Sequence, residues 1–188
     1  YRSTSSYCFI SMKQDAIEKL AGAIRDVPDF PKPGIIFKDI TPLLGNPELF
    51  SLIGDVLADP FRDTQVDKVV GIDARGFIFA TQVAERLNAG FVPIRKKGKL
   101  PFKTKARSYA LEYGQDDMEI HVDAVEPGQK VLIIDDLLAT GGTASAAKKL
   151  VEEVGGEVVG VSFLIELAFL EGRKLLGENA PIKAAIVY

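Results

Sequence analysis

The sequence contains one cysteine, Cys8, and one histidine, His121, among its 188 residues. A single cysteine excludes an internal disulfide and any zinc site built from several cysteines. A single histidine argues against a multi-histidine metal centre and against a serine–histidine catalytic triad. We therefore expect a protein of a reducing compartment, the cytoplasm.

Long apolar runs and blocks of positive charge are also missing. No apolar stretch reaches the length of a membrane span, and none has the layout of a secretion signal. The net charge is −3 and the one basic block runs from Arg95 to Lys99, which argues against nucleic acid as the main partner. With 47% hydrophobic and 26% charged residues, the composition is that of an ordinary globular domain. Neither nucleic acid nor a membrane is therefore expected as a partner.

The first eleven residues differ from the rest of the chain. Tyr1 to Ser11 are rich in serine, threonine and tyrosine and show no clear period, whereas Met12 opens an amphipathic stretch. We expect residues 1–11 to be an upstream or vector-derived segment and residues 12–188 to form a single domain. Apolar positions between residues 14 and 27 fall on one helical stripe, which predicts a helix there.

Further along the chain, short apolar segments alternate with segments of helical period. Strands are predicted over 67–72, 91–94, 131–134, 158–164 and 182–187, helices over 46–57 and 76–88 and from about 144, a polar loop over 96–107, and a hairpin from 108–113 and 118–122. This alternation predicts an α/β fold, a doubly wound and mostly parallel sheet flanked by helices. Ligands bind such sheets beyond the carboxyl ends of their strands.

The segment from Val131 to Thr143 carries the most information. Four branched apolar residues lead to the adjacent carboxylates Asp135 and Asp136, followed by a small-residue turn and a predicted helix. Glycine-rich turns at a helix N-terminus present backbone N–H groups and a positive dipole end to an anion. A phosphate is therefore predicted on Ala139, Thr140, Gly141, Gly142 and Thr143. The two carboxylates would accept hydrogen bonds from the hydroxyls of an attached ribose. The segment is not a nucleotide P-loop, because that motif needs Gly-Lys followed by Ser or Thr.

Three basic residues extend the predicted site. Arg75 stands where another strand turns into a helix and would grip a pyrophosphate with both arms of its guanidinium group. Arg95 and Lys99, at the edge of the polar loop, would meet the same pyrophosphate. A pyrophosphate also calls for a hard divalent cation, Mg²⁺, which the substrate and water would hold without a dedicated set of protein ligands.

Together these elements resemble the phosphoribosyl pyrophosphate (PRPP) binding motif and site of the type I phosphoribosyltransferases, a glycosyltransferase family. Three further segments resemble its adenine-specific members from about Asp15 to the end: residues 29–40, the run Ala74-Arg75-Gly76-Phe77, and residues 108–114. The resemblance implies a homodimeric enzyme of purine salvage that converts adenine and PRPP into AMP and pyrophosphate. It also implies a small N-terminal hood over the base, from about residue 12 to residue 45.

The resemblance also assigns roles to single residues. In the family, adenine stacks on a ring at the position of Phe37 and is read by backbone groups at the positions of Ile36 and Lys38. Glu112 is implied as the catalytic carboxylate and Tyr113 as a residue of loop closure. A cis peptide bond is implied between Asp73 and Ala74.

Each assignment also has an ordinary structural explanation, such as a core ring for Phe37 or an outward-facing strand residue for Glu112. Two other functions stay open at this point. One is transfer to another base, such as xanthine, orotate or uracil. The other is a PRPP-binding regulator that has kept the fold and lost the chemistry.

Overall fold

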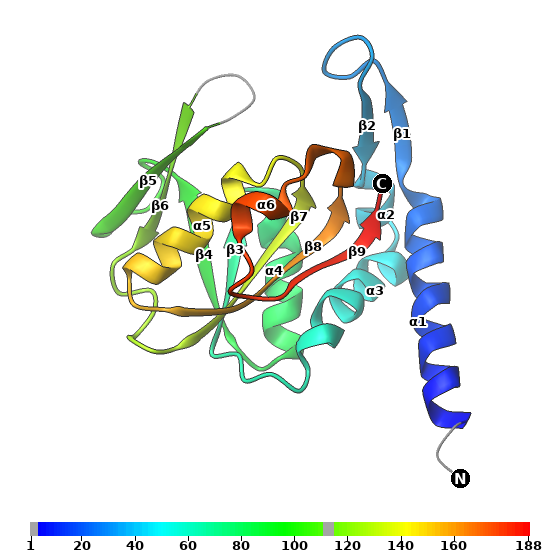
Figure 1. Ribbon diagram of the computed structural model, residues 1–188, viewed down its shortest axis with the longest axis horizontal. Coiled ribbons are helices and arrows are strands. Elements are labelled where there is room, and N and C mark those ends of the chain that lie inside the picture. Colours follow the sequence, from blue (N-terminus) through cyan, green and yellow to red (C-terminus); the bar gives the residue numbers. More distant parts are fainter. Residues whose placement is uncertain (1–3, 111–114) are drawn as a thin grey trace. The chain divides into compact units, whose positions relative to one another are not determined.

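The computed structural model describes residues 4–110 and 115–188 (Figure 1). The chain forms two compact units, residues 1–56 and residues 57–188. No helix in the described ranges combines the length and the apolar character that a membrane span requires.

The first unit contains three helices and a two-stranded antiparallel sheet. Its elements are α1 (Thr4–Ala23), β1 (Arg25–Pro28), β2 (Ile36–Asp39), α2 (Thr41–Leu44) and α3 (Pro47–Ala58), whose last two residues belong to the second unit. As the sequence suggests, Asn46 caps α3, since its Oδ1 accepts hydrogen bonds from the N–H groups of Glu48 at 3.0 Å and Leu49 at 3.1 Å.

The helix predicted over residues 14–27 is wrong at both ends, because it begins at Thr4, within the segment that shows no clear period in the sequence. It stops at Ala23, and Arg25–Pro28 pairs instead with β2, with Val27 opposite Phe37. A residue that precedes proline avoids the helical conformation, which favours an extended Val27. The guanidinium of Arg25 adds hydrogen bonds to the carboxylate of Asp39 at 3.0 and 2.7 Å across the two strands.

The second unit is built on a seven-stranded sheet with the order β5-β6-β4-β3-β7-β8-β9. The strands from β4 to β9 in that order are parallel, whereas β6 and β5 are added antiparallel at one edge. The fold class predicted from the sequence is therefore confirmed. The elements are η1 (Asp59–Phe61), β3 (Lys68–Ile72), α4 (Arg75–Arg86), β4 (Gly90–Lys96), β5 (Thr104–Ala110), β6 (Gln115–His121), β7 (Lys130–Leu138), α5 (Gly142–Glu153), β8 (Glu157–Glu166), η2 (Ala168–Leu170), α6 (Arg173–Leu176) and β9 (Ile182–Val187).

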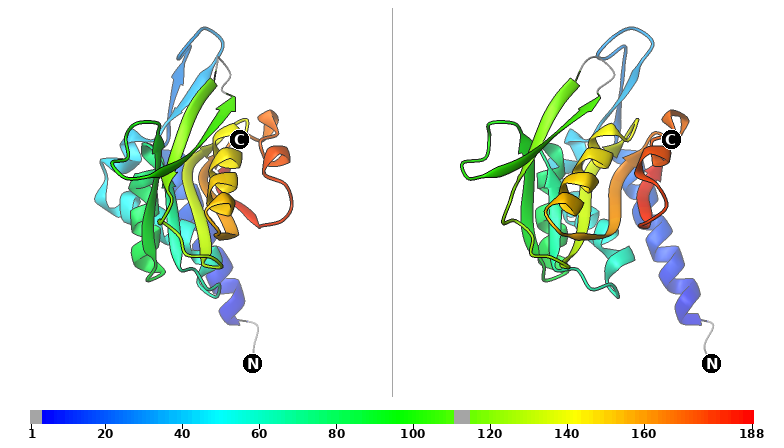
Figure 2. Two further views of the ribbon diagram at one scale, coloured as in Figure 1. Left: turned by 90° about the vertical axis from the view of Figure 1, so that its left-hand side faces the viewer. Right: turned by 60° about the vertical axis from the view of Figure 1, so that its left-hand side comes forward.

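The helices α4 and α5 cover opposite faces of this sheet (Figure 2). The reason lies in the strand order: β3 crosses through α4 to β4 on one side, and β7 crosses through α5 to β8 on the other side. The order therefore reverses between β3 and β7, which is where doubly wound sheets form a ligand crevice. Residues 131–134 of β7 are fully buried at the centre of the sheet, so the crevice stands on a rigid base.

Several predicted boundaries are wrong in the second unit. The strand with the acid pair continues through Asp135 and Asp136 to Leu138, because its pairing with β8 extends that far. The loop predicted over residues 96–107 is shorter, because residues 104–107 belong to β5 and pair with β6. As an edge strand with polar, half-exposed positions, β5 lacks the apolar alternation that would reveal it in the sequence. The hairpin is present, but its second strand begins at Gln115 rather than at residue 118, so residues 115–117 are paired with β5 instead of forming the turn. Residues 111–114 lie outside the described ranges.

Candidate active site

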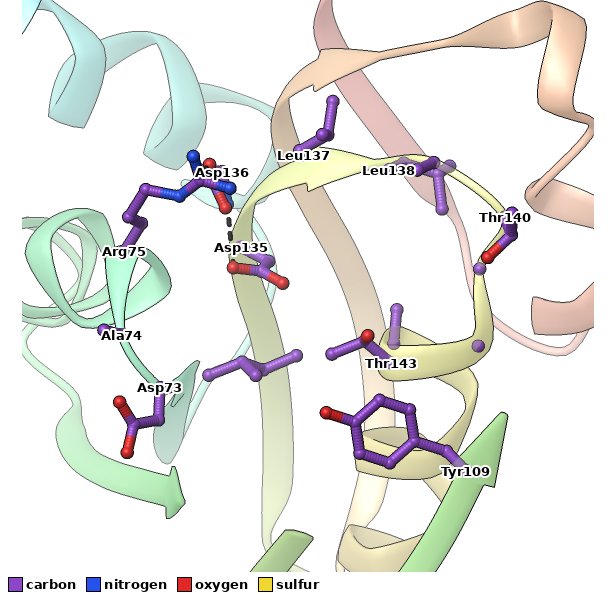
Figure 3. Close-up of a pocket in the computed structure, with 15 residues that line it drawn as sticks. Asp73, Ala74, Arg75, Tyr109, Asp135, Asp136, Leu137, Leu138, Thr140 and Thr143 are labelled. Carbon is purple, nitrogen blue, oxygen red and sulfur yellow. Dashed lines mark hydrogen bonds and ion pairs between the residues drawn. The ribbon is translucent and has the colours of Figure 1, made fainter. Parts of the chain in front are cut away.

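A cavity of about 330 Å³ lies in the second unit where β3 and β7 end (Figure 3). Its wall combines the turn from β3 into α4, the end of β7, the loop into α5, and Tyr109 of β5. Most of the predicted PRPP-binding residues line it: Arg75, Asp135, Asp136, Ala139, Thr140, Gly141, Gly142 and Thr143. The topology thus brings together residues that the sequence separates by sixty positions.

The loop from Ala139 to Thr143 has the geometry of an anion cradle. Gly141 has φ 84° and ψ −4°, a left-handed conformation that glycine adopts without strain, and α5 begins at the next residue. The first N–H groups of α5 have no partner within their own helix and the helix dipole adds a partial positive charge. A phosphate is therefore favoured at this end of the cavity.

Gly172 packs against the back of this loop. A Cβ atom added to Gly172 would lie 2.2 Å from the carbonyl oxygen of Ala139, and one added to Gly141 would lie 2.2 Å from the carbonyl oxygen of Gly172. The neighbouring Arg173 is held by Glu166 at the end of β8, with its Nε and Nη2 hydrogen bonds at 2.7 and 2.6 Å. Backbone against backbone contact therefore fixes the curvature of the loop from behind.

The acid pair forms the opposite wall of the cavity. Asp135 and Asp136 are 9% and 7% exposed, and the N–H of Asp136 donates to Oδ1 of Asp135 at 2.9 Å. Burial, reinforced by the charge of Asp136, raises the pKa of Asp135 well above its usual value. Burial also raises the pKa of Asp136, although the Arg75 guanidinium opposes that shift. The burial of two carboxylates lowers the stability of the folded protein. Such a loss is expected where ionisable groups are positioned to bind a ligand.

Arg75 begins α4 and reaches across to the acid pair (Figure 3), with its Nε 2.8 Å from Oδ2 of Asp136. The peptide bond between Asp73 and Ala74 is cis, so this prediction is confirmed. Gly76 follows Arg75, and a Cβ atom there would lie 2.7 Å from Oδ1 of Asp135. The start of α4 and the acid pair are therefore in direct contact.

The other described residues of the predicted site do not line the cavity. Neither Arg95 nor Lys99 is among the described residues that line the cavity. Nε of Arg95 is, however, 3.1 Å from Oδ2 of Asp73, which does line the cavity. Ile36, Phe37 and Lys38 belong to β2 in the first unit, where the ring of Phe37 meets that of Phe30 edge to face with centroids 5.2 Å apart. Glu112 and Tyr113 lie outside the described residues.

Sequence reasoning did not single out Tyr109 and Gly172. Tyr109 is half-buried in the cavity wall, where its ring lies near Thr143 (Figure 3). Burial raises the pKa of its phenol, although the charge of Lys96 and a hydrogen bond with Thr143 oppose that shift. Alternation along β5 would have indicated that its side chain shares a face with Arg107 and Lys105, but not which face is turned to the cavity. Gly172 gives no local signal, because its role depends on a loop thirty residues earlier in the chain.

Comparisons with known proteins agree with this geometry. Residues 39–175 match the model of the phosphoribosyl transferase domain, which defines the class of protein. The chain is 56% identical over 176 residues to the adenine phosphoribosyltransferase of Rhizobium leguminosarum, covering 94% of this chain and 97% of the relative. The chain belongs to the adenine phosphoribosyltransferase family.

Solved structures support the same assignment. The adenine phosphoribosyltransferase of Rhodothermus marinus superposes with a TM-score of 0.87 at 57% identity, covering 93% of this chain and 99% of that one. The enzyme of Saccharomyces cerevisiae, solved with adenine and an imino-altritol bisphosphate, superposes with a TM-score of 0.86 at 39% identity, covering 92% and 99%.

Proposed function

We propose that this protein transfers the phosphoribosyl group of PRPP to adenine, giving AMP and pyrophosphate in purine salvage. The observation that carries this proposal is the meeting of a buried acid pair and a phosphate cradle in one cavity, in a chain that is 56% identical to an adenine phosphoribosyltransferase. The cradle suits the phosphate on the ribose, and the acids suit the ribose hydroxyls between that phosphate and the reacting carbon.

In the reaction, the bond between the ribose carbon and the pyrophosphate oxygen breaks, and a bond from that carbon to a ring nitrogen of adenine forms. Positive charge grows on the ribose as the pyrophosphate leaves with the bonding electrons. The carboxylates of Asp135 and Asp136 stabilise this charge at short range, and their burial strengthens the effect. Arg75, Arg95 and Lys99 are proposed to hold the departing pyrophosphate.

Magnesium fits this arrangement as a substrate-bound ion. Within the described residues, no group of three His, Cys, Asp or Glu side chains could hold a metal, whereas the cavity offers two carboxylates as hard oxygen donors. Mg²⁺ prefers oxygen ligands and keeps several waters, so the oxygens of PRPP would supply most of its ligands. When bound, it would neutralise charge on the pyrophosphate.

Adenine is proposed to stack on Phe37 and to be read by backbone groups of Ile36 and Lys38, within a hood of about residues 12–45. The side chain of Lys38 is engaged by Asp26, with Nζ 2.7 Å from Oδ1, which supports recognition through the backbone rather than through the lysine. Adenine presents one donor and one acceptor on its pairing edge, and hypoxanthine presents the inverse pattern. Hypoxanthine would leave buried polar groups without partners.

Glu112 is proposed to accept the proton that the reacting ring of adenine loses, and Tyr113 to help exclude water. Water in the site would hydrolyse PRPP without forming a nucleotide.

Residues 12–188 are proposed as the functional domain, and residues 1–11 as dispensable. The homodimer and the cytoplasmic location expected from the sequence stay predictions.

The purified protein, supplied with PRPP and Mg²⁺, is expected to release pyrophosphate and form AMP with adenine. With hypoxanthine or guanine, kcat/KM is expected to fall by about 10⁴-fold, because a site that pairs with adenine leaves its own groups unpaired with the wrong base. Pyrophosphate release and nucleotide chromatography measure both products. Equal turnover of hypoxanthine would assign another base to the enzyme, and binding of PRPP without turnover of any base would favour a regulator.

Two alanine variants should separate base binding from chemistry. Phe37→Ala is expected to raise the KM for adenine about tenfold and to leave the KM for PRPP nearly unchanged, because it removes a stacking surface of one substrate. Glu112→Ala is expected to lower kcat by about 10² to 10⁴-fold, the usual contribution of a positioned proton acceptor. Steady-state kinetics with each substrate varied in turn supply kcat and both KM values for each variant. Full turnover by the Glu112 variant would remove that residue from the mechanism.

A further inference from the structure

Glu119 is a buried carboxylate outside the cavity that the reaction does not use. It lies on β6 between Arg95 of β4 and Ala106 of β5, and it is 4% exposed. Within the described part of the chain no cation pairs with it, and all its hydrogen bonds come from neutral donors. A buried carboxylate destabilises the fold unless it accepts enough hydrogen bonds, so the donors around Glu119 indicate its role.

Three successive backbone N–H groups point at one oxygen of Glu119. Oε1 accepts from the N–H groups of Gly98 at 3.0 Å, Lys99 at 3.1 Å and Leu100 at 3.0 Å. Oε2 accepts from the hydroxyl of Thr104 at 3.1 Å. Burial alone would raise the pKa of Glu119, but these hydrogen bonds outweigh it and hold the pKa below the usual value. The side chain is therefore an anion enclosed by a backbone turn.

This turn contains Lys99 and contacts Arg95, two basic residues of the proposed site. The carbonyl oxygen of Lys99 accepts a hydrogen bond from Nη1 of Arg95 at 3.3 Å. The Nε of the same arginine meets Oδ2 of Asp73, in the cavity wall, at 3.1 Å. The position of the Lys99 carbonyl depends on the turn, and the turn is organised around Glu119. A continuous chain of contacts therefore runs from Glu119 to the mouth of the crevice.

We propose that Glu119 is a positioning residue that fixes the turn of residues 98–100 and thereby places Arg95 and Lys99 to bind the pyrophosphate of PRPP. The inference rests on the proposed function, because it takes PRPP as the substrate. Misplacing a binding group by about 1 Å is enough to cost up to 10²-fold in activity, so a residue that acts only through such a turn has a measurable effect.

The test compares Glu119→Ala with Glu119→Gln and with Asp117→Ala. The alanine variant is expected to raise the KM for PRPP about tenfold, with kcat and the KM for adenine changed less than about threefold. Glutamine should restore most of the PRPP affinity, because its amide oxygen still accepts the three N–H groups and its amide nitrogen can donate to the hydroxyl of Thr104.

Asp117 is the matched control, since it lies on the same strand and pairs with the side chains of Lys97, at 3.1 Å, and Ser108. Its variant is expected to keep the PRPP KM within about twofold, because its side chain does not hold the backbone of the turn. An equal rise for Asp117→Ala would assign the effect to the hairpin as a whole. An unchanged PRPP KM in Glu119→Ala, or equal rises in both KM values, would also overturn the inference.

A double-mutant cycle tests whether Glu119 acts through the turn. In a Lys99→Ala background, Glu119→Ala is expected to add less to the PRPP KM than it does alone, because the two residues share one structural route. Full additivity would contradict that route.

If Glu119→Ala does not fold, Glu119→Asp carries the same prediction, because its shorter side chain would not reach all three N–H groups. A wild-type protein that makes no AMP would refute the proposed function. If the wild type makes AMP but substitution of Glu119 leaves the PRPP KM unchanged, only this inference is refuted.

Discussion

Asp135→Asn is expected to lower kcat/KM by about 10² to 10³-fold and to leave the folded protein at least as stable as the wild type. Asparagine has nearly the same shape and still accepts one hydrogen bond. It lacks the negative charge that would stabilise the positive ribose as pyrophosphate leaves. Steady-state kinetics measure the first effect and urea denaturation the second.

The stability half of this prediction follows from the raised pKa of Asp135. A carboxyl group whose pKa is higher in the folded state binds more protons folded than unfolded, so the free energy of unfolding falls as the pH rises. This fall starts at about pH 4, the ordinary carboxyl range, and ends where the raised pKa is passed. Asparagine does not titrate, so the variant should show a smaller fall across this window. A variant that is strongly destabilised at neutral pH would contradict the prediction.

Asp67→Asn is a control in which stability is expected to change in the opposite direction. Asp67 lies outside the cavity wall, and hydrogen bonds lower its pKa, chiefly one from the N–H of Lys130 to its Oδ2 at 2.7 Å. A lowered pKa contributes stability above the unfolded value and loses it as the pH falls, so this variant should lose stability and keep its activity. The pair of variants thus separates a carboxylate held for its substrate from one held for the fold.

The parts of the site that the sequence predicts well are contiguous or follow a general rule of topology. Asp135 and the loop of residues 139–143 form one uninterrupted motif, whose chemistry can be derived residue by residue. The convergence of Arg75 on that motif follows from the rule that parallel strands present their carboxyl ends at one edge. The fold class follows from the alternation of strands and helices, which local patterns reveal.

The parts that the sequence leaves hidden depend on contacts between distant segments. Glu119 looks like an ordinary strand residue until β4 and β6 pair and bring the turn of residues 98–100 over it. Tyr109 belongs to an edge strand without an apolar pattern, so the sequence does not indicate which side chains turn inward. Gly172 supports the phosphate loop through backbone packing, and no local pattern of residues encodes such a contact.

Gly141→Ala is expected to lower kcat/KM for PRPP by about 10²-fold, since displacement of a binding loop by about 1 Å suffices for such a loss. The methyl group would lie 2.2 Å from the carbonyl oxygen of Gly172, so one of the two backbones must move. The left-handed φ of 84° adds a strain of about 1–2 kcal/mol for any residue with a side chain.

Gly128→Ala separates these two effects. Gly128 has nearly the same φ, 83°, but a Cβ atom there meets nothing within 4 Å, and the residue lies outside the cavity wall. It should lose a similar 1–2 kcal/mol of stability, about the strain alone, and keep its PRPP kinetics. If both variants lose activity equally, strain transmitted through the fold explains the result. If only Gly141→Ala loses it, the packing of Gly172 against the loop is what shapes the phosphate cradle.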